Sequence, residues 1–368
     1  MIYLDHHACA PIDPRVLRVM DSVRREPLGN PASPHASGRR ARAHLEHARA
    51  QVARAVGARP AEVVFTSGGT EACNLGVLGL ARSVGRVVTT PIEHPAVAEP
   101  VAALANARFA LPLAEGLPPD ESVVLGALGA EPCALLAVQW VNHETGAILP
   151  VERWVALAAS AGVPSFVDAT QALGKIGIDF DALGASALAL ASHKIGGPAG
   201  AGALVVRRGV AIDPRMLGGA QERGLRAGTP DVVALAGFGA ACALVEERLR
   251  HQARVAPMRD RIEAALIARG ARVNGASRRV ATVVNASIQG WRASTLVAAL
   301  DLEGLEIASG AACSSGVDRP SPVVLAAFPD DPARAASAIR VSLGPETSDE
   351  DVTRALAILE RVLDRAPA

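Results

Sequence analysis

Two lysines stand out among the side chains of this sequence that could do chemistry. Lys175 and Lys194 are the only lysines in 368 residues, and every other basic residue apart from histidine is an arginine. A genome rich in G and C would produce this bias wherever only charge matters. Arginine stays protonated, however, and cannot act as an amine nucleophile. A lysine that persists in such a composition is therefore a candidate for amine chemistry.

Lys194 has the neighbours that such chemistry needs. It ends the run Ser192-His193-Lys194 after an apolar segment, and glycines follow it. Burial at the end of a strand would lower its pKa and make it a candidate Schiff-base amine, whereas the alternative is an ordinary lysine in a surface loop. Lys175 lacks a neighbouring hydroxyl and imidazole, so we interpret it as structural.

Cys313 is the second candidate nucleophile. It lies in a segment, 307–316, that consists almost entirely of Gly, Ala and Ser, which predicts an accessible loop. A thiol presented in this way can act as a nucleophile if its surroundings lower its pKa. The other cysteines lie mostly in apolar or helical settings typical of buried Cys, although one of them follows the N-terminal His pair closely. These four are Cys9, Cys73, Cys133 and Cys242.

Two further segments could present polar groups to a ligand. An apolar run ends in Asp168, with Gln171 three residues later, so the carboxylate could pair with a protonated ring nitrogen or a metal, or cap the next helix. The segment Ser67-Gly68-Gly69-Thr70 joins an apolar run to a helical pattern, and its backbone N–H groups could hold an anion. An ordinary glycine turn with Thr70 as helix cap is the simpler interpretation, since the segment matches neither common nucleotide-binding glycine pattern.

Arginines mark two more sites. Arg340 lies within a short apolar run, a costly position unless the guanidinium holds a carboxylate through two hydrogen bonds. The polar, glycine-rich stretch 218–229, which contains Arg223 and Arg226, predicts a loop at an active site or a subunit contact. For each site the alternative is an arginine in a structural salt bridge.

Alternating strands and helices must position these candidates. Apolar runs predict strands at 62–66, 86–90, 134–141, 163–168, 186–191 and 202–206. Helical periodicity predicts helices at 38–56, 71–80, 95–104, 151–161 and 231–249. This alternation is typical of an α/β domain with a largely parallel sheet, in which ligands bind at the carboxyl ends of the strands. Beyond about residue 250 the strand signals weaken, which predicts a smaller α+β domain.

Composition argues against several classes of protein. The 37 basic and 37 acidic side chains cancel, which disfavours a dedicated nucleic-acid-binding protein. No apolar run approaches the roughly 18 residues of a membrane span, and the N-terminus lacks the layout of a signal peptide. The five cysteines lie far apart without a C-x-x-C pair, so we expect neither a zinc cluster nor a disulfide framework. A cytoplasmic protein without a metal site is the expectation.

Taken together, the motifs resemble those of a known enzyme family. In chain order they are YLDHHA, GNPASPH, FTSGGTEACN, IEHPAV, VNHETG, VDATQALGK, ASHKIGGP, QERGLRAGT, SGAACSSG and AIRVSLG. Their order and spacing resemble the cysteine desulfurases of the NifS/IscS type, which use pyridoxal 5'-phosphate (PLP) and belong to the class V aminotransferase-like group. The resemblance implies the PLP-dependent transferase fold (fold type I), with a mainly parallel seven-stranded sheet. It further implies a large domain at 14–249 and a small α+β domain made of 1–13 and 250–368.

The resemblance also implies a role for each candidate residue. Lys194 would bind the PLP aldehyde covalently and later move protons at the substrate Cα. Asp168 would pair with the pyridinium nitrogen, Gln171 would bond the phenolic oxygen, and His94 would stack on the ring as an acid or base. The phosphate would be held by Gly69, Thr70, Ser192, His193 and, in a homodimer, Thr229 of the partner subunit. Substrate would be bound by Arg340, at its carboxylate, and by Asn142 or His143.

The implied reaction converts L-cysteine to L-alanine. Cys313 would attack the substrate sulfur and keep it as a persulfide, for transfer to an acceptor protein in iron–sulfur cluster assembly or a thiolation pathway. The enzymatic alternatives, which do not generally need the loop thiol, are a selenocysteine lyase, a C–S lyase and a class V aminotransferase. The alternative from a different class is a non-catalytic, PLP-binding scaffold.

Three segments depart from the family pattern. Asn142-His143-Glu144 stands where Asn-Asn-Glu is usual, so the substrate contact could fall on either of its first two residues. Ala8-Cys9-Ala10-Pro11 places a thiol where a hydroxyl is common, and Gly197-Pro198-Ala199-Gly200 lacks the usual tyrosine and lysine. These departures leave the choice between cysteine and selenocysteine, and the sulfur acceptor, open.

Overall fold

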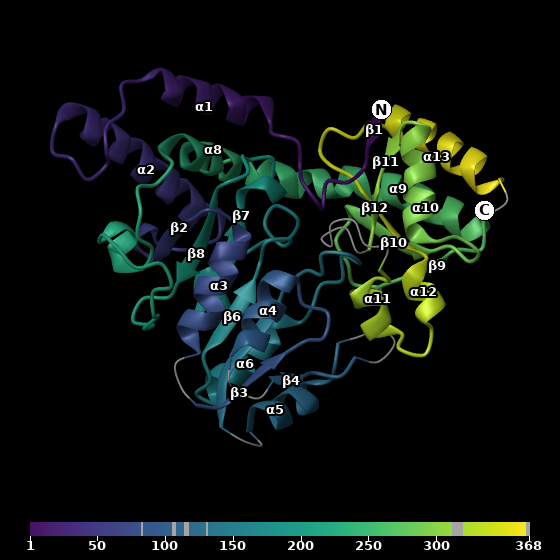
Figure 1. Cartoon of the computed structure of the whole chain (residues 1–368), viewed down its shortest axis with the longest axis horizontal. Coiled ribbons are helices and arrows are strands. Elements are labelled where there is room, and N and C mark those ends of the chain that lie inside the picture. The colour runs from purple at the N-terminus through teal and green to yellow at the C-terminus, as the bar shows by residue number, and fades with distance from the viewer. Residues whose placement is uncertain (82–83, 105–107, 114–117, 130–131, 311–318, 366–368) are drawn as a thin grey trace.

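The computed structural model of the chain describes residues 1–81, 84–104, 108–113, 118–129, 132–310 and 319–365 (Figure 1). Cys313 lies outside the described residues. Among the residues that are described, no helix is long and apolar enough to cross a membrane.

A seven-stranded sheet forms the centre of the first part of the chain. Its strand order is β2-β8-β7-β6-β5-β3-β4, and every strand is parallel to the others except β8, which runs antiparallel to both of its neighbours. The strands are β2 (Val63–Thr66), β3 (Arg86–Thr89), β4 (Arg108–Ala110), β5 (Cys133–Gln139), β6 (Ser165–Asp168), β7 (Ala187–Ala191) and β8 (Gly202–Val206). The expected fold class, with its mainly parallel seven-stranded sheet, is confirmed.

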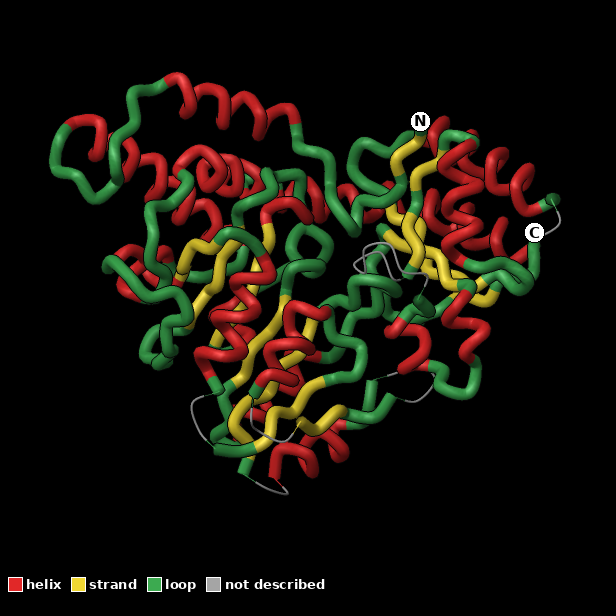
Figure 2. The backbone as a smooth tube through the Cα atoms, viewed as in Figure 1, coloured by secondary structure: helices red, strands yellow, loops and turns green. Residues whose placement is uncertain are grey.

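Helices cover both faces of this sheet, as Figures 1 and 2 show. Successive strand residues point to opposite faces, so Val63 and Phe65 pack into one core and Val64 into another. The core with Val64 contains α3 and α4, and the opposite core contains α2, α5, α6 and α8. The helices of this part are α1 (Pro14–Arg25), α2 (Ala36–Ala55), α3 (Gly69–Leu80), α4 (Pro95–Ala103), α5 (Glu121–Gly129), α6 (Val151–Ser160), α7 (Phe180–Leu183) and α8 (Val232–Cys242).

The two ends of the chain build a second core around a smaller antiparallel sheet of order β12-β13-β10-β9. The N-terminal strand β1 pairs in parallel with β11 and so joins this lobe (Figure 2). The strands are β1 (Ile2–Tyr3), β9 (Arg272–Val273), β10 (Val283–Ser287), β11 (Leu305–Glu306), β12 (Ala308–Ser309) and β13 (Ala338–Ser342). The helices are α9 (Val245–Ala268), α10 (Ala293–Leu302), α11 (Pro322–Ala327), α12 (Pro332–Ala336) and α13 (Asp349–Leu363).

The prediction of one long helix at 231–249 is wrong in one respect, because the chain forms two helices there. α8 ends at Cys242 and is buried almost throughout, whereas α9 begins at Val245 and carries many charged residues. α9 also runs from one core to the other, since Val245 packs in the first and Met258 in the second. The domain limits given above for 14–249 and 250–368 stay a prediction.

Helix α3 lies so close to the sheet that its glycines cannot be enlarged. A Cβ atom added at Gly76 would lie 2.3 Å from Cε2 of Phe166, a fully buried side chain on β6. β6 ends at Asp168, so this packing fixes the helix against the strand that carries the carboxylate.

We predict that Gly76→Ala lowers the free energy of unfolding by about 1–3 kcal/mol, because the added methyl forces the helix and strand apart. Gly126→Ala is the matched control in α5, where nothing lies within 4 Å of the added Cβ. It should stabilise the protein by about 0.5–1 kcal/mol through helix propensity. Urea unfolding measures both, and equal effects of the two substitutions would contradict the close packing.

Candidate active site

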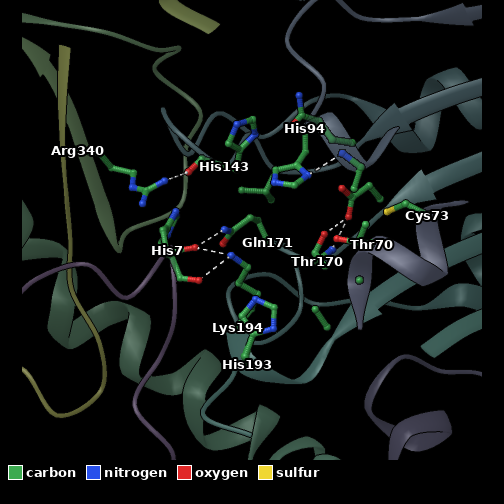
Figure 3. A pocket seen from close by; sticks show the side chains of 17 residues that line it. His7, Thr70, Cys73, His94, His143, Thr170, Gln171, His193, Lys194 and Arg340 are labelled. Atoms are coloured by element: carbon green, nitrogen blue, oxygen red, sulfur yellow. Dashed lines mark hydrogen bonds between the residues drawn. The ribbon is translucent and has the colours of Figure 1, made fainter. Parts of the chain in front are cut away.

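A cavity of about 290 Å³ lies at the carboxyl ends of β6 and β7 (Figure 3). The carboxyl ends of parallel strands are the expected place for a ligand in such a sheet. The residues predicted from sequence that line it are Gly69, Thr70, His94, His143, Asp168, Gln171, His193, Lys194 and Arg340. Residues far apart in the sequence therefore meet in one place.

The amine of Lys194 is held by the N-terminal segment of the chain. Lys194 ends the 3₁₀ turn Ser192–Lys194 that follows β7. Its Nζ donates to the carbonyl oxygens of His7, at 2.8 Å, and Ala8, at 2.9 Å (Figure 3). Because both acceptors are backbone atoms of neighbouring residues, the position of the amine depends on the path of the N-terminal segment.

Asp168 is the last residue of β6, and Thr170 fixes its carboxylate. Oδ1 accepts from the backbone N–H of Thr170 at 2.9 Å and from the hydroxyl of the same residue. The methyl group of Thr170 also touches the start of α3, where a Cβ at Gly69 would lie 2.7 Å from Cγ2. Burial first, and then the charge of Asp168, raise the pKa of the Cys73 thiol well above its usual value, so this thiol stays protonated beside the carboxylate.

Gln171 is held at both ends of its amide. Nε2 donates to the carbonyl oxygen of His7 at 2.8 Å, and Oε1 accepts from Nζ of Lys175 at 3.0 Å. A buried amide whose oxygen faces an ammonium group can offer only its NH2 group on the other side. Sequence reasoning missed this contact of Lys175, although the spacing of four residues from Gln171 is the signal that could have found it.

Two imidazoles lie edge to face at the cavity. The ring centroids of His94 and His143 are 5.0 Å apart and their planes meet at 84°. Nδ1 of His94 accepts from the backbone N–H of Ala96 at 3.0 Å, so the neutral ring carries its proton on Nε2. Burial is the largest effect that lowers the pKa of each ring, and for His143 the charges of His94, Arg340 and Lys194 add to it.

Of the two residues predicted for one substrate contact, only His143 lines the cavity. Asn142 instead holds the turn after β5. Its Oδ1 accepts from the backbone N–H groups of Glu144, at 3.0 Å, and Thr145, at 2.8 Å, and Nδ2 donates to the carbonyl oxygen of Ile92 at 3.2 Å. His143 is therefore the better placed of the two, because the polar atoms of Asn142 are bonded to the backbone, and the substrate contact itself stays a prediction.

Arg340 is both ion-paired and part of the cavity wall. It lies on β13 and is 4 % exposed. Nη2 pairs with Asp5 at 2.7 Å and Nη1 donates to the carbonyl oxygen of His143 at 3.1 Å. Its Nε is buried without a hydrogen-bond partner. A structural ion pair thus orients the guanidinium and leaves its Nε–H available.

Besides Asn142, two described residues that the sequence predicts for the site, Ser192 and Thr229, do not line this cavity. Ser192 is fully buried and does not line the cavity, and its hydroxyl faces Gly197, where a Cβ would lie 2.1 Å away. Thr229 lines a different cavity, of about 170 Å³, together with Ser67 and Arg226. Cys313 falls outside the described residues.

The described chain that leads to Cys313 nevertheless runs beside the cavity. β12 pairs with β13 so that Ala308 lies opposite Arg340, and the N–H of Gly310 donates to the carbonyl oxygen of Ala338 at 3.2 Å. The chain therefore enters the segment that contains Cys313 next to a residue of the cavity wall.

Sequence reasoning also missed several residues that line the cavity. They are His7, Ala8, Cys73, Gln139 and Thr170. His7 and Ala8 act through backbone oxygens, which no side-chain pattern reveals. His193, which was predicted, has its pKa lowered to about 4, by burial first and then by the charges of Lys194, Lys175 and His94. Among the described residues, no group of three or more His, Cys, Asp or Glu side chains could hold a metal ion.

Comparison with known proteins agrees with the motif pattern. The Aminotransferase class-V family model matches residues 2–355. The chain is 40% identical to an IscS-like cysteine desulfurase of Mycobacterium tuberculosis, over 100% of this chain and 97% of the relative. It is 33% identical to the cysteine desulfurase NifS of Azotobacter vinelandii, over 96% of this chain and 90% of the relative. The solved structure of a NifS-like protein superimposes with a TM-score of 0.90 at 30% identity, over 99% of each chain. The expected resemblance is thereby confirmed.

The buried imidazole of His143 predicts a loss of stability in acid. Its pKa in the folded protein lies well below the usual value of 6.5, so below about pH 6.5 the unfolded chain binds a proton that the folded chain does not. The free energy of unfolding should fall as pH falls from about 6.5 toward 5. In His143→Asn the slope of this fall should be smaller by up to about 1.4 kcal/mol per pH unit. His47→Asn, at an exposed site of α2, is the control. Equal slopes for wild type and His143→Asn in urea unfolding would contradict this account.

Proposed function

Because the chain belongs to the aminotransferase class-V family, we propose that it is a PLP-dependent cysteine desulfurase that converts L-cysteine to L-alanine and passes the sulfur to an acceptor protein. One observation carries this proposal. Lys194 and Asp168 stand at the carboxyl ends of the neighbouring strands β7 and β6 and line one cavity. An amine and a carboxylate in this relation are what PLP requires of a protein.

The other cavity residues fit PLP as well. The N-terminus of α3, at Gly69 and Thr70, offers backbone N–H groups to a phosphate. Gln171 turns its NH2 group away from Lys175 and can donate to the phenolic oxygen of the cofactor. PLP, when bound, supplies an electron sink that stabilises the carbanion left when the substrate loses its Cα proton.

The protein's own groups bind the substrate and move its protons. Arg340 is oriented by Asp5, and its unpartnered Nε supports a contact with the carboxylate of L-cysteine. Lys194 is the base for the Cα proton, because its amine lines the cavity and is positioned there by the backbone oxygens of His7 and Ala8. His94 is neutral with its proton on Nε2, so it can donate a hydrogen bond from Nε2 or stack on the cofactor ring.

The sulfur step requires Cys313. Its thiolate attacks the sulfur of the substrate, so an S–S bond forms as the Cβ–S bond breaks, and Cβ gains a proton to complete alanine. One L-cysteine and one thiol thus give one L-alanine and one persulfide, with no external oxidant or reductant. The described strand that precedes Cys313, β12, pairs with β13 beside Arg340.

The assembly and location of the protein belong to the same proposal. We infer a homodimer in which Thr229 contributes to the phosphate site of the partner subunit, because within its own chain it lines a different cavity from Lys194. The described cysteines, Cys9, Cys73, Cys133 and Cys242, are free thiols, which supports a reducing, cytoplasmic location. Iron–sulfur cluster assembly or a thiolation pathway would consume the persulfide.

Two substitutions separate cofactor binding from sulfur transfer. Lys194→Ala should remove the visible absorbance of covalently bound cofactor and abolish alanine formation. Cys313→Ala should keep that absorbance but lose the persulfide, and its alanine production should fall by at least about a thousandfold. Absorbance spectra and an alanine assay without added thiol measure these effects.

Cys9→Ala is the matched control, because Cys9 is the exposed thiol among the described cysteines and lies in the segment that holds Lys194. It should keep both absorbance and alanine production. Full alanine and sulfide release by Cys313→Ala would contradict the assigned nucleophile and point to a C–S lyase. Cofactor absorbance without any alanine from the wild-type protein would instead support a non-catalytic scaffold.

A further inference from the structure

Lys194 lines a second, smaller cavity of about 40 Å³ that the proposed reaction does not use. Its wall contains the basic side chains of His6, Lys175, Lys194, Arg248 and His251. Among the described residues that line it, none carries a carboxylate. A water molecule needs roughly 10–15 Å³ of such space, so the cavity has room for a small ligand but not for a substrate-sized one.

Buried polar atoms without partners belong to residues that line this cavity, one in the N-terminal segment and three on α9. His6 and Arg248 are each 7 % exposed, yet Nδ1 of His6 and Nε of Arg248 make no hydrogen bond. Nδ1 of His251 and Oε1 of Gln252 also lack partners, and both residues line the cavity. Buried polar groups in native proteins are nearly always bonded, so this group of atoms indicates a polar occupant.

The charges around the cavity indicate whether its occupant is a water molecule or an anion. Lys175 donates to the neutral oxygen of Gln171, and no ion pair to a described carboxylate balances its charge. Burial, followed by the charges of Lys194, Arg248 and Arg340, lowers the pKa of Lys175 to about 7. The other titratable groups that face it, His6, His7 and His193, are also basic. A water molecule could satisfy the hydrogen bonds but would not favour the protonated form of Lys175, whereas an anion would.

The acidic side chains nearest to the cavity already form ion pairs with other basic side chains. Asp13 lies 3.5 Å from Arg248 but makes a closer, 2.8 Å pair with Arg15, and Asp5 pairs with Arg340. Glu346 acts on Arg248 and is not among the groups that shift Lys175. Lys175 is therefore the amine at this cavity that lacks an acidic partner among the described residues.

We propose that this cavity binds a small monovalent inorganic anion of the halide class, between Lys175, Arg248 and His6. Close packing of side chains against two glycine backbones limits the size of the site. A Cβ at Gly196 would lie 2.4 Å from Nη2 of Arg248, and one at Gly344 would lie 2.1 Å from Nδ1 of His6. The bound anion keeps Lys175 protonated, so that Lys175 continues to hold the oxygen of Gln171 and the NH2 group stays on the side of the active site.

The chain offers an unusually direct test, because it contains only two lysines. Full-length protein labelled with ¹³C-lysine should give two Cε resonances, and Lys175→Met assigns them by removing one. The pH titration of the Lys175 signal is recorded between about pH 5 and 9 in sodium chloride and in sodium gluconate of equal ionic strength, since gluconate is too large for the cavity. The titration does not depend on catalysis, so it stands apart from the test of the proposed function.

Chloride should raise the midpoint of Lys175 by about one pH unit, a tenfold gain in proton affinity, in a saturable way. Arg248→Gln should abolish this shift, whereas Arg261→Gln, at an exposed ion pair farther along α9, should keep it. Crystals grown with bromide should show an anomalous peak in the cavity, a result that needs no variant. The same midpoint in chloride and gluconate, or a cavity without a bromide peak, would overturn the proposal.

Discussion

The site depends on one short segment, residues 5–8, that ties the two cores together. On one side the carbonyl oxygens of His7 and Ala8 accept from the amine of Lys194, which follows β7 of the large sheet. On the other side Asp5 pairs with Arg340 on β13 of the small sheet. Because one short segment makes both contacts, through backbone oxygens on one side and the Asp5 carboxylate on the other, it fixes the amine and the guanidinium relative to each other. Displacing this segment would disturb both groups together.

A second constraint is the concentration of basic side chains around that segment. Lys175, Lys194, Arg248 and Arg340 lie close enough to lower the pKa values of one another or of nearby imidazoles. Burial works in the same direction, so His6 and His193 are neutral at physiological pH, with pKa values of about 4. Such an environment favours anionic ligands. It contains two cavities, one large and one small, and Lys194 lines both of them.

The sequence predicted those parts of the fold and site whose signals are local. Strand ends are marked by apolar runs, so the sequence places Asp168 and Lys194 at the carboxyl ends of strands, whereas the pairing of these two strands is seen only in the structure. Contacts made by backbone atoms, such as the oxygens of His7 and Ala8, have no side-chain signature, so they could not be predicted from the sequence. The sequence indicates a structural role for Lys175 because no hydroxyl or imidazole stands next to it. Its bond to Gln171 follows from the four-residue spacing only if the chain makes a helical turn there. The choice between Asn142 and His143 likewise needed the turn geometry.

The central claim is that a thiol of this chain, Cys313, receives sulfur from L-cysteine. It is tested most directly by mass spectrometry of the purified protein after brief exposure to L-cysteine, with alkylation and peptide mapping. The account predicts a gain of one sulfur atom on the peptide that contains Cys313 and an equivalent amount of alanine in solution. Alanine or pyruvate without a modified Cys313 would contradict the claim and identify a lyase or an aminotransferase on the same fold.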